Sequence, residues 1–303
     1  MPPGTRTPGP TGLPDETNAS HRQPGPLGIG DETVLPAADG ATPMPLQATP
    51  PKEITEPSPV FMDKGLTLKN VVTPLFEKEP QPADVIQGNI ANCPIAAVMV
   101  AVAHTQPALL KGMIGEQTVD VVSKDKSDST WSVKTNKLLT VQFRKGSPVE
   151  MSRLLYHNKE SDLVYARASR NVSWVSFIEK GYAVWRGGNS YNGLNDTTTL
   201  NGPPTANKVM EDVVGAYEYT APAATADKDL LAILAKAKTK ATIAASQATL
   251  PDESPVVANH GYAVMGVSGK TVLLRNPWGG EDADKKLPLK DFKTAFQAVL
   301  QEK

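Results

Sequence analysis

Several features that would assign a common class of function are missing from this sequence. Its 303 residues include a single cysteine, Cys93, so no intramolecular disulfide can form, and a chain of this length needs none to hold a core. Its 31 basic and 32 acidic side chains leave a formal charge of −1, which gives no positive field to attract phosphate groups. The longest apolar run, residues 94–103, is half the roughly 20 residues that a spanning helix needs. We therefore expect no nucleic acid and no membrane among its partners.

The first 60 residues lack aromatic side chains altogether. They hold 14 of the 27 prolines and 7 of the 23 glycines, and their charges sum to −4. So little apolar surface cannot offset the entropy lost on folding, so we predict a disordered Pro/Gly-rich leader over residues 1–61. A proline-rich ligand for a partner's aromatic groove is the alternative. Without an apolar stretch of signal-peptide length, we expect a cytoplasmic protein or one exported by a signal-peptide-independent route.

The remaining residues mix helical and strand patterns, with mostly strand patterns from Thr239 onward, which predicts the α+β class. Residues 94–103 are apolar on every face, as is typical of a helix buried in a domain, and Pro94 suits its first turn. We predict further helices over residues 174–185, 205–214, 227–238 and 291–300, and strands over residues 131–143, 162–167, 239–243, 256–267 and 271–275. The last two strands would form a hairpin through a three-residue loop, 268–270.

Cys93 directly precedes the predicted buried helix. The unpaired N–H groups at a helix start favour negative charge, so we expect a lowered thiol pKa and a candidate nucleophile. The alternative is an inert thiol that packs as a small core residue. A nearby base would decide between the two.

Four histidines could supply that base, and one of them is suitably placed. His260 stands in a mostly apolar segment, where it is either the base or a buried core residue. His21 lies in the predicted leader, and His157 lies in a polar stretch. His104 is on the same helix as Cys93 but about 16 Å away along it.

A three-residue hairpin loop would place Tyr262 opposite Asn276 and His260 opposite Trp278. Asn276 would then lie diagonally across from His260, where its amide oxygen can orient the imidazole while Trp278 shields the bond. A two-residue loop would move Asn276 to the other face. Cys, His and Asn in this order are the nucleophile, base and orienting residue of papain-like cysteine proteases.

Several motifs occur in the order in which the calpain family has them. Gln87 and Gly88 precede Cys93 by six and five residues, as in the calpain active-site segment. Residues 275–279 read RNPWG, as they do in that family. Similar matches follow the family order at residues 174–191, 210–215, 260–264 and 291–296. From about residue 70 to 303, the sequence therefore resembles a calpain protease core.

The resemblance implies a papain-like fold of two lobes, with a helical lobe over residues 62–216 and a β-rich lobe over residues 217–303. We expect a stand-alone core without the C2-like and EF-hand domains of conventional calpains. Two positions depart from the family pattern and put the substrate subsites in question. Pro94 follows the nucleophile where calpains have tryptophan, and Asn259 precedes His260 where they have glycine.

The resemblance also implies a role for each site residue. Cys93 would be the nucleophile, His260 the general base and then acid, and Asn276 the residue that orients it. Gln87 would donate to the oxyanion, unless it is a solvated loop residue, and Trp278 would support His260. We predict no metal and no cofactor.

The function implied is a calpain-like cysteine endopeptidase that hydrolyses peptide bonds in protein substrates through a thioester acyl-enzyme. A microbial secreted effector or toxin fits this reading, with secretion machinery or an inhibitor or immunity protein as a further partner. Two alternatives stay open: an acyltransferase or deamidase toxin with the same triad, and a pseudoprotease that only binds a partner.

Overall fold

A computed structural model describes residues 54–124, 131–195 and 203–303, and these form one compact unit. Residues 1–53 of the predicted leader lie outside the described residues. Residues 54–61, which we had assigned to the leader, pack against the unit: Ser58 bridges to Ser190, and Glu56 pairs with the buried Lys180. The predicted leader boundary at residue 61 is therefore wrong, because residues 54–61 belong to the folded unit.

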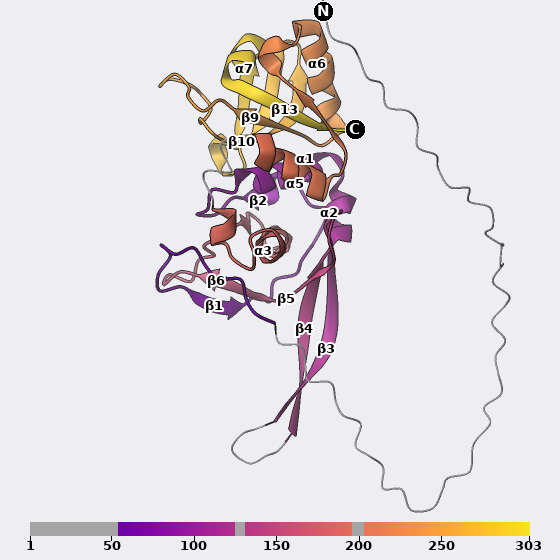
Figure 1. The fold of residues 1–303 in the computed structure, drawn as a ribbon, viewed down its shortest axis with the longest axis vertical. Helices are drawn as coiled ribbons and strands as arrows, with labels where there is room; N and C mark the ends of the chain where they lie inside the picture. Colours follow the sequence, from indigo (N-terminus) through magenta and orange to yellow (C-terminus); the bar gives the residue numbers. More distant parts are fainter. Residues whose placement is uncertain (1–53, 125–130, 196–202) are drawn as a thin grey trace, which may run out of the picture. The chain divides into compact units, whose positions relative to one another are not determined.

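Helices and strands follow one another in short groups along the described residues (Figure 1). The helices are α1 (Cys93–Thr105), α2 (Pro107–Met113), α3 (Trp174–Trp185), α5 (Pro203–Val213), α6 (Asp227–Ala235) and α7 (Leu289–Ala295). The strands are β1 (Thr67–Asn70), β2 (Val85–Ile86), β3 (Ile114–Lys124), β4 (Trp131–Val141), β5 (Val149–Ser152), β6 (Leu154–His157), β7 (Arg167–Ala168), β8 (Tyr217–Thr220), β9 (Thr242–Ser246), β10 (Gly261–Ser268), β11 (Thr271–Arg275), β12 (Asp284–Pro288) and β13 (Phe296–Glu302). None of these helices combines the length and apolarity needed to cross a membrane.

The largest sheet has six antiparallel strands in the order β12-β11-β10-β9-β13-β8. Alternate residues of its central strands point to opposite faces, as the pleat of a sheet requires. Ile243, Ala263 and Leu300 join the hydrophobic cluster around α1, whereas the neighbouring residues Ala244, Tyr262 and Val299 join a second cluster with residues of α6 and α7. Both faces of this sheet are therefore buried.

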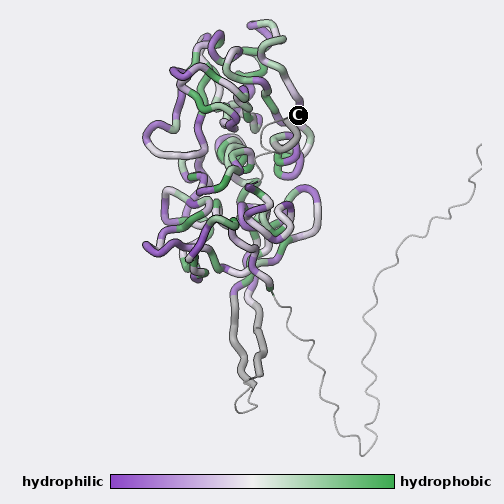
Figure 2. Tube along the Cα trace, turned by 60° about the vertical axis from the view of Figure 1, so that its left-hand side comes forward, coloured by the Kyte–Doolittle hydropathy of each residue, from purple (hydrophilic) through white to green (hydrophobic). Residues whose placement is uncertain are grey.

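Helix α1 lies between this sheet and the smaller sheets (Figure 1). It contacts β9 and β10 of the large sheet as well as β2, α3 and α5. Residues 93–103 of this helix are all buried, which explains why its sequence is apolar on every face. Figure 2 shows hydrophobic segments running through the inside of the unit and hydrophilic segments in its outer loops.

Three smaller sheets complete the described unit, with strand orders β1-β6, β2-β7 and β3-β4-β5. Mixed helix and sheet confirm the α+β class. All six strands of the large sheet lie after residue 216, whereas residues 62–216 carry the three smaller sheets beside four helices. The division into two lobes stays a prediction.

Most of the predicted elements are present, but four of them are corrected. The closing helix 291–300 is wrong because α7 ends at Ala295 and the chain continues as β13, where pairing with β8 and β9 outweighs a local helical pattern. The strand predicted over residues 162–167 is reduced to β7 and a bridge at Leu163. Strand β9 begins three residues later than predicted, and β10 begins only at Gly261, so His260 lies in a loop.

The hairpin of β10 and β11 reaches the predicted register by a different route. Ser268 pairs with Thr271, so the loop has two residues rather than three, which alone would shift the register by one. A bulge between Val264 and Gly266 shifts it back, and Ala263 pairs with Arg275. Asn276 consequently follows β11 on the side predicted from the sequence.

Candidate active site

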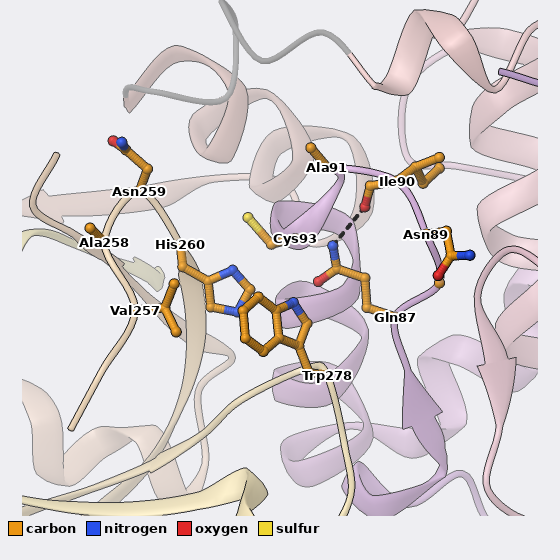
Figure 3. A pocket seen from close by; sticks show the side chains of 11 residues that line it. Gln87, Asn89, Ile90, Ala91, Cys93, Val257, Ala258, Asn259, His260 and Trp278 are labelled. Atoms are coloured by element: carbon orange, nitrogen blue, oxygen red, sulfur yellow. Dashed lines mark hydrogen bonds between the residues drawn. The ribbon is translucent and has the colours of Figure 1, made fainter. Parts of the chain in front are cut away.

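One cavity brings together four of the five predicted site residues. It has a volume of about 330 Å³ and is lined by Gln87, Cys93, His260 and Trp278, together with residues 88–91 and 257–259 of the loops on either side (Figure 3). The fifth residue, Asn276, is hydrogen-bonded to His260. Residues more than 160 positions apart in the chain thus meet in one pocket.

Cys93 is the first residue of α1, which begins one residue earlier than predicted, and it is almost fully buried. Its sulfur accepts a hydrogen bond of 3.4 Å from the N–H of Gly261 on β10. Burial raises the pKa of the thiol to about 11, while the N–H groups of Gly261 and of Cys93 itself oppose that rise. The lowered pKa expected at a helix start is therefore wrong, because loss of water outweighs the favourable dipoles.

His260 is held by the backbone and side chain of Ser246 on β9. The His260 N–H donates to the Ser246 hydroxyl over 2.9 Å, and the Ser246 N–H donates to the His260 carbonyl, also over 2.9 Å. Asn259, which precedes the histidine, has a φ of 51°, in the left-handed region where glycine and asparagine are best tolerated. The departure from the family's glycine thus keeps a residue suited to the turn.

The imidazole of His260 is oriented by Asn276. The ring Nε2 lies 2.8 Å from Oδ1 of Asn276, and the Trp278 N–H donates to the same oxygen over 3.0 Å. Because that atom accepts from a backbone N–H, it is the amide oxygen, and Nε2 of the ring carries the proton. The other ring nitrogen, Nδ1, is left as the one that can accept a proton.

Aromatic rings enclose the imidazole. The Trp278 ring lies 4.7 Å from it and remains about half exposed, while the Tyr262 ring meets it edge-on at 5.0 Å. Burial lowers the pKa of His260, and the hydrogen bond that the ring donates to Asn276 opposes this change. Burial thus disfavours the charged imidazolium form of this ring.

Gln87 enters the pocket from the segment before α1. Its backbone N–H donates to the Pro277 carbonyl over 2.8 Å, which ties this segment to the loop that carries Asn276. Its side-chain Nε2 donates one hydrogen to the Ile90 carbonyl over 2.8 Å (Figure 3). An amide nitrogen has two hydrogens, so one more can be donated.

Gly88 shows why a glycine follows Gln87. A Cβ atom at this position would lie 2.3 Å from the backbone of Tyr165, closer than real contacts allow. The chain can pass only if no side chain is present. Gln87 thus supplies a polar side chain to the pocket, and Gly88 allows the chain to pass close to the backbone of Tyr165.

A thiol, an imidazole and an amide around one cavity form the residue set of enzymes that transfer acyl groups through a cysteine. The sequence model of the calpain family cysteine proteases matches residues 51–287. The chain therefore belongs to the calpain family of cysteine proteases, a family of cysteine peptidases. A comparison with curated proteins found no match.

Asp284, after the loop that carries Trp278, pairs with Arg275. Among the described residues, no group of three or more potential metal ligands occurs. Two polar residues near the pocket were missed by sequence analysis: Ser246, which holds His260, and Glu179, which contacts Asn92. Only Glu179 had a sequence signal, as an acidic residue within a largely apolar helical segment.

Proposed function

We propose that this chain is a calpain-like cysteine endopeptidase with a papain-like fold of two lobes. The observation that carries the proposal is the single cavity shared by Cys93, His260 and Gln87, with Asn276 bonded to the imidazole. Membership of the calpain family supports the same reaction class. The two lobes would be residues 62–216 and 217–303, with the pocket between them.

Acylation would begin with transfer of the Cys93 proton to Nδ1 of His260. Since burial raises the thiol pKa to about 11, the sulfur ionises only as the imidazole takes this proton. The thiolate attacks the peptide carbonyl, and a carbon–sulfur bond forms as the carbonyl oxygen becomes an anion. His260 then returns the proton to the leaving amine, the carbon–nitrogen bond breaks, and a thioester remains on Cys93.

Deacylation would use the same groups in reverse. His260 takes a proton from water, and the hydroxide attacks the thioester carbonyl. The carbon–sulfur bond then breaks, His260 returns the proton to the Cys93 sulfur, and the new carboxyl end is released. Asn276 keeps the imidazole in the tautomer that both steps require. The free N–H of Gln87 and the backbone N–H of Cys93 would stabilise the oxyanion of each tetrahedral intermediate.

Hydrolysis of fluorescently labelled casein tests the proposal. We expect turnover by the native chain and none by Cys93→Ala, because the substitution removes only the nucleophilic sulfur. Thermal melting of both proteins checks that the variant folds. A deamidase would instead release ammonia without shortening the casein, and a binding module would do neither; either result would contradict the proposal.

A further inference from the structure

Glu179 of α3 is a buried carboxylate behind the nucleophile. Its side chain is about 1% exposed. One carboxylate oxygen accepts a hydrogen bond from the side-chain amide of Asn92, and the other accepts from the Ala166 N–H over 2.8 Å. Both donors are neutral groups. Burying a carboxylate with only neutral partners is costly, so the residue calls for an explanation.

Two other buried carboxylates of the protein are arranged differently. Asp84 and Asp212 are fully buried, and each forms a bidentate ion pair with an arginine, Arg170 and Arg186. Those pairs compensate the charge where it is buried. Glu179 has no such cation within the described part of the chain. One of its oxygens accepts from Asn92, which precedes Cys93, and the other accepts from Ala166, which precedes β7.

Asn92 connects Glu179 to Gln87 through the Ile90 carbonyl. Asn92 directly precedes Cys93, and its backbone N–H donates to the Ile90 carbonyl over 2.9 Å. The same carbonyl accepts the hydrogen bond from Gln87 Nε2. A carboxylate that fixes the Asn92 side chain therefore also fixes the carbonyl that sets the direction of the Gln87 amide.

We propose that Glu179 is a positioning residue for the oxyanion site, acting through Asn92 and the Ile90 carbonyl on Gln87. The inference rests on the proposed function, because an oxyanion site matters only if Cys93 adds to carbonyl groups. The ionised carboxylate suits this position since both its oxygens accept. Burial raises the pKa of Glu179 to about 7, so the assays below are run at pH 8, where the ionised form predominates. A glutamine at 179 would present an NH₂ group to one of the two N–H donors and could hold only the other.

Glu179→Gln is the variant that tests this role, and Ser176→Ala is its matched control. Ser176 lies one turn earlier on α3 and is buried like Glu179. Both side chains line one small cavity, and the Ser176 hydroxyl has no hydrogen-bond partner among the described residues. It has no contact with Asn92 or Gln87 among those described. A loss that follows from disturbing α3 would appear in both variants, whereas a loss of positioning would appear only in Glu179→Gln.

Two reagents separate the oxyanion site from the thiol. A peptide aldehyde such as acetyl-Leu-Leu-norleucinal adds the Cys93 sulfur to its carbonyl carbon while the thiol proton moves to the oxygen, which occupies the oxyanion site. Iodoacetamide alkylates the same sulfur with loss of iodide, and no oxyanion forms. A misplaced Gln87 therefore weakens aldehyde binding and leaves alkylation unchanged.

For Glu179→Gln we expect kcat on casein and aldehyde affinity to fall together by about 10- to 100-fold, less than the usual cost of deleting an oxyanion donor. KM and the alkylation rate should stay close to native values, and a cooperative melting transition should show that the variant is folded. Ser176→Ala should retain kcat and aldehyde affinity. The double variant Asn92→Ala/Glu179→Gln should lose little more than either single variant, since both act through one contact.

The inference is overturned if Glu179→Gln keeps native kcat and aldehyde affinity, or if Ser176→Ala loses as much. Should Glu179→Gln fail to fold, Asn92→Ala decides, because native kcat in that variant would equally overturn the role. If the native chain neither cleaves casein nor binds the aldehyde, the proposed function fails and this inference with it. If the native chain does both, only the positioning role is in question.

Discussion

The two sides of the pocket hold their reactive groups by different means. Cys93 begins a helix that is buried along its first eleven residues, so the position of the sulfur follows from the packing of α1. His260 precedes a strand and donates hydrogen bonds to Ser246 and Asn276, which belong to other segments. The proposed nucleophile is thus placed by one apolar segment, and the proposed base by long-range polar contacts that single substitutions can break.

The largest effect that tests this difference is expected for His260→Ala. We expect kcat to fall by about 10²- to 10⁴-fold, the usual contribution of a positioned general base. The thiol must then ionise without a partner, and because burial raises its pKa to about 11, iodoacetamide should react more slowly at pH 7. Alkylation rate against pH measures this, with His157→Ala as a control, and an unchanged profile would contradict the pairing of thiol and imidazole.

Gln87→Ala should have the next largest effect, on the Cys93 side of the pocket. Removing one oxyanion donor is expected to lower kcat by roughly 10²- to 10³-fold. Iodoacetamide should still alkylate Cys93 at the native rate, since that reaction needs no oxyanion donor. Casein hydrolysis, alkylation and melting temperature together decide the matter, and native kcat would leave Gln87 as an ordinary loop residue.

Ser246→Ala tests how far the position of His260 depends on side chains. The substitution leaves the buried His260 N–H without its acceptor, at a cost of about 1–3 kcal/mol in the free energy of unfolding. We expect a melting temperature lower by several degrees and a kcat lower by a few fold. Ser254→Ala, in the exposed loop before Val256, should change neither, and equal losses in both would argue against a specific contact.

The smallest expected effect concerns the pH dependence of stability. Burial raises the pKa of Glu179 to about 7, whereas an unfolded glutamate titrates near 4.3. Between these values only the folded state holds the proton, so this group stabilises the fold at pH 5 and loses that contribution as pH rises to 8. His260, whose pKa burial lowers, acts in the opposite direction.

Melting temperatures between pH 5 and 8 isolate the contribution of Glu179. In Glu179→Gln the side chain stays neutral, so the variant should gain stability relative to the native chain as pH rises, by a few degrees at pH 8. A constant difference across this range would show that the carboxyl group does not titrate there.

The same contrast explains what the sequence could predict. Local apolar patterns predicted α1 to within one residue of its start and predicted α3 over its exact range, residues 174–185. The candidate site residues were chosen by motif, and four of them line one cavity. A local pattern is sufficient to predict an element whose conformation depends mainly on its own side chains.

Long-range contacts account for what the sequence could not predict. Strand β13 was mistaken for a helix because its partners β8 and β9 lie far away in the chain. The bulge near Met265 cannot be read from the hairpin sequence, although it sets the register of Asn276. Burial, which reverses the expected direction of the Cys93 pKa, also appears only once the chain is folded.

The central claim is that Cys93 hydrolyses peptide bonds with the help of His260. The most direct test is to incubate a mixed protein substrate with the native chain and with Cys93→Ala, and to identify new N-termini by mass spectrometry. The account predicts new N-termini with the native chain and none with the variant, although both fold. N-termini produced equally by both proteins, or by neither while the native chain is folded, would contradict it.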